Sequence, residues 1–411
     1  MTRALVVAMA LGLASMAQAL TVSSDFEGGS CRVLKVDEAA QVVEVMPGGD
    51  PHRGWPCWWY FRLEACKPGA EVTVLLHGSD APMPRDASHQ PLAASWAMPG
   101  KAFFSADGEH WEKTQAGHME NGAIRYVFTP QDGAILVAWG PAFTPSRAVA
   151  VVKDLAAQHA AFAKSEELCQ SRAGRPVPML HVMEGDTLAQ KRPAVWIEAR
   201  QHAWESGSSW VAQGFMEWLV GDDPEAIRLR RQAEIYCVPV MDIDNTATGN
   251  GGKDALPQDH NRDWSEEPHW NEVVAAQGRV RDFVKQGRMA VFIDLHNPAP
   301  SDKKAFFYVL PADLLKPAMV TVRDRFIGMA AANIGKLYPM QAKPKEDGPK
   351  YHPLWRQMSG TWVSMNGNPE TVGICLETAW DVPEAGTDGY RKVGSALAAT
   401  VAEFLREKGG S

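Results

Sequence analysis

The chain has 411 residues, with 41 Lys and Arg against 49 Asp and Glu, so its formal net charge is −8. Hydrophobic residues make up 45% and charged residues 22%, a balance typical of a globular protein, which excludes a disordered tail, a coiled coil and a collagen-like chain. The acidic balance, with no long run of Lys and Arg, argues against nucleic acid as the main partner.

The first 19 residues have the pattern of a secretory signal peptide. Arg3 provides the positive N-terminal region, Ala4 to Ala14 is apolar, and Ala17-Gln18-Ala19 is a small-x-small cleavage site. An uncleaved anchor is the alternative, but the apolar run is short for a membrane span of ~20 residues. We therefore expect a periplasmic or secreted protein that has no contact with the membrane after signal cleavage.

Residues 20–148 contain short strand patterns separated by turn signals and no convincing helix. The predicted strands are 31–36, 41–45, 58–64, 71–76, 102–105, 124–128 and 134–139. Seven short strands at this spacing predict an antiparallel β-sandwich domain. Trp55, Trp58 and Trp59 form a cluster that is favoured as sandwich core over a sugar-binding platform.

From residue 149 to residue 411, apolar strand patterns alternate with helical ones. The predicted strands are 177–182, 194–199, 235–240, 289–295, 306–310 and 372–376, and the predicted helices are 149–162, 208–220, 225–232, 272–285, 319–333 and 390–408. Nearly continuous apolar strands between helices predict a second, α/β domain with a mixed central sheet covered on both faces. Such sheets bind ligands beyond the carboxyl ends of their strands, so motifs at those ends carry weight.

Six cysteines are compatible with an oxidising compartment without requiring one. Cys57 and Cys66 flank one predicted strand, and Cys31 lies upstream, so a disulfide among these three and three free thiols both remain open. Cys237 and Cys375 lie in apolar runs and are expected to be buried thiols.

Two polar motifs at strand ends suggest a metal site. His202 and Glu205 are three residues apart after one predicted strand, so on a helical turn or a tight loop both side chains project the same way. His296 ends another buried strand, and Asp294 is a candidate partner for it. Alone, the first motif is more often a solvated helix face and the second a core histidine. Together they make a His/Glu/His set with an open fourth position, as catalytic zinc uses.

Two further motifs suggest catalysis and substrate binding. Asn261 and Arg262 are adjacent, and an amide beside a guanidinium suits a fork-like grip on a carboxylate, although a surface loop is the simpler reading. His260 beside them is taken as structural. Glu377 closes the last apolar strand, where it is either a charge facing solvent or a general base beside a metal-activated water.

The order of these motifs along the chain resembles the zinc metallocarboxypeptidases of the carboxypeptidase A clan. The segments 23–29, 59–62 and 103–111 are similar to the β-sandwich that precedes the peptidase in the cytosolic carboxypeptidase-like subfamily. The resemblance covers essentially all of the mature chain, and the signal sequence indicates an exported, bacterial-type member.

The resemblance implies a role for each matching residue. His202, Glu205 and His296 would bind one zinc ion per chain. Asn261 and Arg262 would hold the carboxylate at the substrate's C-terminus, and Glu377 would act as the base. The implied activity is hydrolysis of the C-terminal bond of peptides or proteins, with no implication for the oligomeric state.

The sequence departs from the family pattern at two segments that bear on the site. The family supplies an oxyanion donor as the Arg of a Gly-Asn-x-Arg segment, whereas residues 249–253 contain no Arg and place Lys253 one position late. Lys253 is a candidate replacement, although it cannot form the fork of Arg. Cytosolic members carry a Gly-Thr-Ala-Arg segment associated with acidic substrate tails. Here Trp362 stands in that segment, and we count it as a substrate-binding candidate.

Two alternatives to a carboxypeptidase stay open at this point. One is a zinc amidase that releases amino acids from N-acyl groups or acts on cell-wall peptides, because related deacylases share the His-x-x-Glu, Asn-Arg and His pattern. The other is an inactive module that binds peptides or glycans, which the missing Arg and the tryptophan-rich N-terminal region favour.

Overall fold

A computed structural model of the protein describes residues 19–85, 88–185, 188–189 and 192–409. The expected signal peptide, residues 1–19, lies outside the described residues except for Ala19. No helix in the described part of the chain is both long enough and apolar enough to cross a bilayer.

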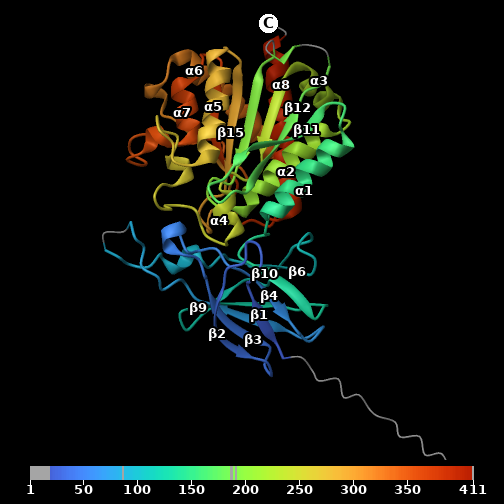
Figure 1. Cartoon of the computed structure of the whole chain (residues 1–411), viewed down its shortest axis with the longest axis vertical. Helices are drawn as coiled ribbons and strands as arrows, with labels where there is room; N and C mark the ends of the chain where they lie inside the picture. The colour runs from blue at the N-terminus through green and yellow to red at the C-terminus, as the bar shows by residue number, and fades with distance from the viewer. Residues whose placement is uncertain (1–18, 86–87, 186–187, 190–191, 410–411) are drawn as a thin grey trace, which may run out of the picture.

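The N-terminal region is a sandwich of two five-stranded sheets (Figure 1). Its strands are β1 (Thr21–Ser23), β2 (Arg32–Asp37), β3 (Val42–Met46), β4 (Tyr60–Glu64), β5 (Val72–Leu76), β6 (Phe103–Ser105), β7 (Glu112–Lys113), β8 (His118–Glu120), β9 (Ala123–Phe128) and β10 (Ala134–Ala138). One sheet has the order β1-β4-β10-β6-β7 and the other β2-β3-β5-β9-β8. Pairing is antiparallel except between β3 and β5, which are parallel.

All seven strands predicted for this region are present. The strands that sequence reasoning missed, β1, β7 and β8, have two or three residues each and none of them is buried, whereas β6, also three residues long, contains the apolar pair Phe103 and Phe104. The tryptophan cluster divides between two environments. Trp58 and Trp59 are buried in the core as predicted, whereas Trp55 is half-buried and its Nε1 donates to Asp254 Oδ2 at 2.7 Å, outside the sandwich.

All six cysteines lie among the described residues and are free thiols. Cys57 and Cys66 stand on either side of β4, whose five extended residues span about 17 Å. A disulfide needs Cα atoms within about 7 Å, so this pair is out of reach. Of the two possibilities left open for Cys31, Cys57 and Cys66, the structure has the free thiols.

The C-terminal region is built around an eight-stranded mixed sheet with the order β11-β12-β14-β13-β15-β18-β16-β17. Its strands are β11 (Ala163–Gln170), β12 (Pro176–Val182), β13 (Ala194–Ala199), β14 (Glu234–Val238), β15 (Met289–His296), β16 (Phe306–Val309), β17 (Lys345–Glu346) and β18 (Val372–Glu377). Its helices are α1 (Pro145–Gln158), α2 (Ser206–Val220), α3 (Pro224–Gln232), α4 (Ile243–Ala247), α5 (Asn271–Lys285), α6 (Pro317–Ile334), α7 (Ser359–Asn366) and α8 (Thr387–Gly409). Short 3-10 helices within the described residues include 51–53, 94–96, 260–262, 312–314 and 355–357.

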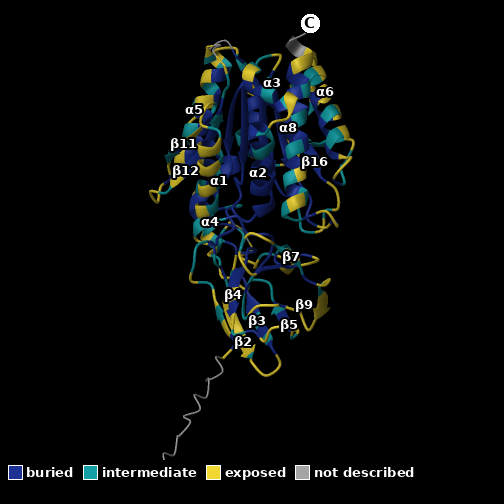
Figure 2. Ribbon diagram, turned by 90° about the vertical axis from the view of Figure 1, so that its right-hand side faces the viewer, coloured by how far each residue is buried: buried dark blue, intermediate teal, exposed yellow. Residues whose placement is uncertain are grey.

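The predicted α/β architecture is present, with helices flanking the sheet (Figure 1). Figure 2 shows a buried interior between helices whose outer faces are exposed. The elements missed from the sequence are β11, which is polar on its exposed side, and the short β17, α4 and α7. Short elements and solvent-facing edge strands lack a continuous apolar pattern.

The centre of the sheet explains where polar side chains gather. Strands β13, β15 and β18 are adjacent and parallel, so their carboxyl ends meet at one edge. In register, His296 of β15 lies beside Glu377 of β18. The sandwich packs against this edge near α4 (Figure 1), where Arg53 Nε donates to Asn245 Oδ1 at 2.7 Å and the Asp50 amide donates to Asn250 Oδ1 at 2.8 Å.

Candidate active site

Three buried side chains converge at the carboxyl ends of β13 and β15. His202, Glu205 and His296 each offer one ligand atom, and these atoms lie within 4.8 Å of one another. His202 Nδ1 is 2.8 Å from Glu205 Oε1, and His296 Nδ1 is 2.7 Å from Glu205 Oε2. His202 lies in the turn after β13, and Glu205 is the residue just before α2, so the three-residue spacing does bring both side chains to one place.

The outer nitrogen of each histidine faces a second carboxylate. His202 Nε2 is 3.2 Å from Asp259 Oδ1, and His296 Nε2 is 2.8 Å from Asp294 Oδ2. Asp294 is held in turn by Gln201 Nε2 and Ser359 Oγ, each at 2.5 Å. A carboxylate behind a histidine fixes the orientation of the ring and makes it a better metal ligand.

This donor set suits zinc. Two imidazole nitrogens and one carboxylate are the ligands of many catalytic zinc sites, whereas Ca²⁺ and Mg²⁺ prefer oxygen ligands alone. Burial would raise the pKa of Glu205, but His202 and His296 hold it well below its usual range, so its carboxylate is ionised. A small cavity borders both histidines and leaves room for a further ligand.

The same cavity brings together most of the residues predicted for the site. Its lining consists of His202, Lys253, Asn261, Arg262, His296, Tyr308, Asp347, Tyr351, Met358, Ser359, Gly360, Cys375 and Glu377. Glu377 Oε2 is buried and accepts no hydrogen bond from the described residues. Burial, and then the negative charge of Glu205, raises the pKa of Glu377 to about 7, although the histidines and Lys253 act in the opposite direction. A carboxylate with this pKa is suited to exchanging protons near neutral pH.

Asn261 and Arg262 lie in the 3-10 helix 260–262, which Asp259 caps by accepting from the Asn261 amide at 2.8 Å. Arg262 is buried, and Nη1 donates to the carbonyl of Asn261 at 2.7 Å. Its Nε finds no acceptor among the described residues. Because an unsatisfied guanidinium is costly to bury, Arg262 is ready for an anionic ligand. The side-chain amide of Asn261 is already engaged. Its Oδ1 accepts from Ser359 N at 3.0 Å, and its Nδ2 lies 3.1 Å from His296 Nε2.

Lys253 reaches the cavity through contacts with the sandwich. The Trp55 amide donates to the carbonyl of Lys253 at 2.8 Å, and Lys253 Nζ lies 5.2 Å from the centroid of the Trp55 ring. Burial and Arg262 would lower the pKa of Lys253, but Tyr351, Asp259 and Glu205 raise it above its usual value. The ammonium group therefore stays charged beside the histidines.

Trp362 is placed differently from our expectation. Its side chain is buried, and its ring centroid lies 5.7 Å from that of Trp264 in the core. The cavity is lined instead by Gly360, two residues earlier on α7. Residues two apart on a helix point to nearly opposite sides, so a helix that turns Gly360 to the cavity turns Trp362 away from it.

His260 has the structural position that we expected. Its ring is buried and stacks on that of Trp270, with centroids 4.8 Å apart and planes at 5°. It does not line the cavity formed by the described residues.

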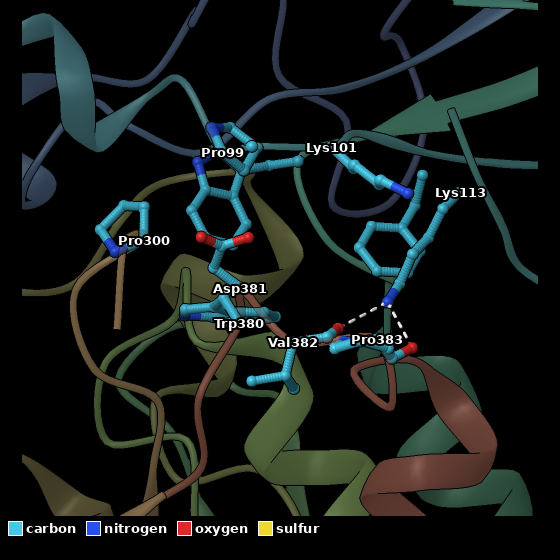
Figure 3. A pocket seen from close by; sticks show the side chains of 11 residues that line it. Pro99, Lys101, Lys113, Pro300, Trp380, Asp381, Val382 and Pro383 are labelled. Carbon is cyan, nitrogen blue, oxygen red and sulfur yellow. Dashed lines mark hydrogen bonds between the residues drawn. The ribbon is translucent and has the colours of Figure 1, made fainter. Parts of the chain in front are cut away.

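A second cavity, of about 330 Å³, lies between the sandwich and the α/β region. Figure 3 shows Lys113 of β7 reaching the segment after β18, where Nζ donates to the carbonyl groups of Val382 and Pro383, both at 3.0 Å. Burial lowers the pKa of this lysine to about 8. Among the described residues that line this cavity, none belongs to the predicted site.

Family comparisons agree with both halves of this structure. Residues 22–139 match the model of the cytosolic carboxypeptidase N-terminal domain, and residues 148–288 match that of the zinc carboxypeptidases. These two segments are similar to the two parts of a cytosolic-type carboxypeptidase. The second match includes His202, Glu205, Asn261 and Arg262 and ends before His296 and Glu377. Both regions of the chain are therefore similar to parts of carboxypeptidases.

Relatives of known sequence match parts of the chain. An uncharacterized protein of Zymomonas mobilis is 25% identical over 248 residues, which is 60% of each chain. Cytosolic carboxypeptidase 4 of Homo sapiens is 31% identical over 156 residues, 35% of this chain and 14% of that protein. Cytosolic carboxypeptidase 2 of Danio rerio is 26% identical over 260 residues, 58% of this chain and 35% of that protein. This chain thus spans less than two thirds of the length of each of these relatives.

Solved structures confirm the predicted fold across nearly the whole chain. A metallo-carboxypeptidase from Burkholderia cenocepacia superposes with a TM-score of 0.77 at 20% identity, covering 95% of this chain and 100% of that one. A metallo-carboxypeptidase from Pseudomonas aeruginosa, in complex with (2-guanidinoethylmercapto)succinic acid, gives 0.74 at 20% identity, covering 94% and 99%. Both share the two-part architecture of a β-rich region followed by the α/β region.

Sequence reasoning missed several residues in and around the active-site cavity. Asp259 was passed over because its partner, His202, is 57 residues away, although a carboxylate next to the Asn-Arg pair was a usable signal. Asp347, Tyr308 and Tyr351 come from β16 and from the segment that follows β17, where no motif marks them.

Proposed function

We propose that this protein is a zinc-dependent carboxypeptidase that hydrolyses the C-terminal bond of peptides, with one zinc ion held by His202, Glu205 and His296. The observation that carries this proposal is a single cavity bordered by both histidines of a His/Glu/His cluster, by a buried guanidinium with an unpartnered Nε and by a carboxylate with a buried, unpartnered oxygen. Zinc bound in such a site lowers the pKa of water and polarises a carbonyl group.

The residues of the chain have distinct tasks in this proposal. Arg262 binds the carboxylate at the end of the substrate through its free guanidinium edge, and Asn261, locked by Ser359, borders the same position. This contact limits the enzyme to the last bond of a chain. Asp259 and Asp294 keep both Nδ1 atoms turned inward.

Proton transfer falls to Glu377. Its free Oε2 accepts a proton from the attacking water and then returns it to the leaving amine, which a group with a pKa near neutrality does well. Lys253 places a positive charge beside the reacting carbonyl, where negative charge develops. We assign it the task that an Arg performs in relatives.

We also propose that residues 20–148 and 149–411 form separate domains, with the first shaping access to the second, and that residues 1–19 direct export. An exported enzyme would meet peptides of the periplasm or of the surroundings.

The test is mass spectrometry of a mixed peptide library incubated with the protein, with and without a chelator. We expect ladders of single C-terminal losses that stop on chelation, return with zinc and are absent with Glu377→Gln. N-acyl amino acids serve as the control for an amidase. Turnover of those compounds alone, or binding of peptides without turnover by zinc-loaded protein, would contradict the proposal.

A further inference from the structure

Asp347 is a carboxylate in the active-site cavity that the proposed chemistry does not use. It follows β17, which pairs with β16, and its amide donates to the Val309 carbonyl at 3.0 Å. By strand alternation its side chain shares a sheet face with Tyr308 of β16. Tyr308 pairs in register with Cys375 of β18, and all three line the cavity.

This carboxylate is buried without a full set of partners. The residue is 4% exposed, and Oδ1 accepts no hydrogen bond from the described residues. No cation in the described part of the chain lies within the 4.0 Å of an ion pair with it, so Arg262, in the same cavity, is not its counter-ion. Burial raises its pKa to about 6, which leaves it largely ionised at neutral pH.

An unpaired buried carboxylate is expensive, and such groups concentrate where a ligand supplies the missing partner. The cavity thus offers two groups of opposite charge that form no ion pair with each other and each have one unpartnered atom, Nε of Arg262 and Oδ1 of Asp347. A C-terminal residue with a cationic side chain carries the complementary pair, a carboxylate and an ammonium or guanidinium group. An acidic side chain would instead meet Asp347 with like charge.

We propose that Asp347 binds the cationic side chain of the substrate's C-terminal residue and makes the enzyme selective for C-terminal Lys or Arg. This inference rests on the proposed carboxypeptidase function and specifies its substrate class. The cavity measures only about 30 Å³, so a neighbouring side chain must move when substrate enters. Tyr351, the one exposed residue among those that line it, at 42%, is the side chain freest to do so.

Two peptides that differ only in their last residue, Lys or norleucine, test the charge directly, because norleucine keeps the four-carbon chain and lacks the ammonium group. We expect kcat/KM to be about 10- to 100-fold higher for the Lys peptide. Asp347→Asn should remove most of this difference by lowering the Lys value and leaving the norleucine value within roughly twofold. Glu346→Gln, an exposed carboxylate on the neighbouring residue, is the matched control and should leave both values unchanged.

The possible results separate this inference from the function on which it rests. Equal rates for the two peptides, or an equal loss for both in Asp347→Asn, would overturn the role of Asp347 and leave the carboxypeptidase in place. If neither peptide is cleaved, the proposed function fails. Calorimetry can then still compare the affinities of the protein for the two peptides. Tighter binding of the Lys peptide, lost in Asp347→Asn, would support the inference, and equal binding would overturn it. Because the two wild-type measurements need no variant, poor folding of Asp347→Asn would not block the test.

Discussion

Glu377 concentrates the chemistry of the site in one carboxylate, and its surroundings pull its pKa in two directions. Burial and Glu205 raise that pKa to about 7, whereas His296, Lys253 and His202 lower it. A bound divalent cation adds positive charge and therefore lowers the pKa of Glu377 in the metal-loaded enzyme below this value. With a pKa at or below about 7, Glu377 is at least half ionised at neutral pH and can still carry a proton.

The first prediction follows from the need for an ionised base. kcat/KM should reach a plateau above the pKa of Glu377, which lies at or below about 7. Below that pKa, kcat/KM should fall tenfold per pH unit, because the base becomes protonated. A pH profile with a saturating zinc concentration measures this limb. If the residual activity of Glu377→Gln falls at low pH with the same pKa as that of the wild type, the titrating group is a residue other than Glu377.

Replacing the base itself is the second prediction. Glu377→Gln keeps the size of the side chain and removes its basicity, so kcat should fall by about 10²- to 10⁴-fold. Bound zinc, measured by mass spectrometry of the intact protein, should stay at one ion per chain because Glu377 is not among the three clustered ligands. Loss of the metal together with the activity would show that the residue acts on the metal site instead.

The carboxylates behind the histidines give the third prediction. Asp259→Asn weakens the hold on His202 Nε2, and zinc affinity should drop by about 10- to 100-fold. Competition with a chromophoric chelator measures the dissociation constant. Asp263→Asn, in the same segment but bonded to the amides of His269 and Trp270, is the control and should leave zinc affinity unchanged.

At the scale of elements, the parallel trio β13, β15 and β18 is what turns distant motifs into one cavity. Each strand is buried along most of its length and ends at the same edge, so residues 199, 296 and 377 arrive together although nearly 180 positions separate the first from the last. At the amino end of the same sheet, a buried glutamate forms ionic and hydrogen-bonded contacts. Glu234 begins β14 and lies against Tyr236, His181 and Arg288.

This amino-end cluster yields a prediction of pH-dependent stability. Burial would raise the pKa of Glu234, but its contacts with His181, Tyr236 and Arg288 lower it to about 2 from an unfolded value of 4.5. A depressed pKa means that the stabilisation is complete above pH 4.5 and is lost as the pH falls towards 2. The amount is on the order of 3 kcal/mol.

Urea unfolding at a series of pH values measures this contribution. Glu234→Gln should lower the free energy of unfolding at pH 7 and approach the wild-type value near pH 2. Glu346→Gln, which removes an exposed carboxylate from β17, should follow the wild-type curve throughout. Parallel curves for Glu234→Gln and wild type would refute the assignment.

At the scale of the whole molecule, the sandwich takes part in building the site. The loop 50–55 meets the loop 249–254 backbone to backbone, with Gly252 N donating to the Arg53 carbonyl at 3.0 Å and Trp55 N to the Lys253 carbonyl at 2.8 Å. Lys253 therefore takes its position from a different region of the chain. The N-terminal sandwich therefore helps to arrange the cavity, because it positions one of the residues that line it.

Gly54 lies at this junction and supports the fifth prediction. It has a φ of +111°, and a Cβ atom there would lie 2.4 Å from Gly252 N, closer than any real contact. Gly54→Ala should lower the free energy of unfolding by roughly 1–3 kcal/mol because of the clash, in addition to the cost of the backbone conformation. It should also lower activity, because the clash displaces the loop that positions Lys253. Gly69→Ala is the control, since φ is +75° and nothing lies within 4 Å. Equal losses in the two variants, measured by urea unfolding, would refute the clash at the junction.

The sequence by itself determined the elements and the residue types at their ends. Period-two and apolar strand patterns located β13, β15 and β18, and a His-x-x-Glu spacing needs only one local turn, so His202, Glu205 and His296 could be expected to meet. Short elements such as β7, β17 and α7 could not be found, because β7 and β17 contain only charged residues and the eight residues of α7 make little more than two helical turns. The direction of the Trp362 side chain could not be predicted for the same reason, since it depends on the unpredicted helix α7.

Only the tertiary structure decided which distant side chains share the cavity. The contact between Asp259 and His202, the place of Lys253 beneath Trp55 and the burial of Asp347 next to Arg262 each join segments that no local pattern connects. Such contacts depend on how sheets, helices and loops pack, which is set by the free energy of burying the whole apolar interior and leaves no trace in the spacing of a few residues.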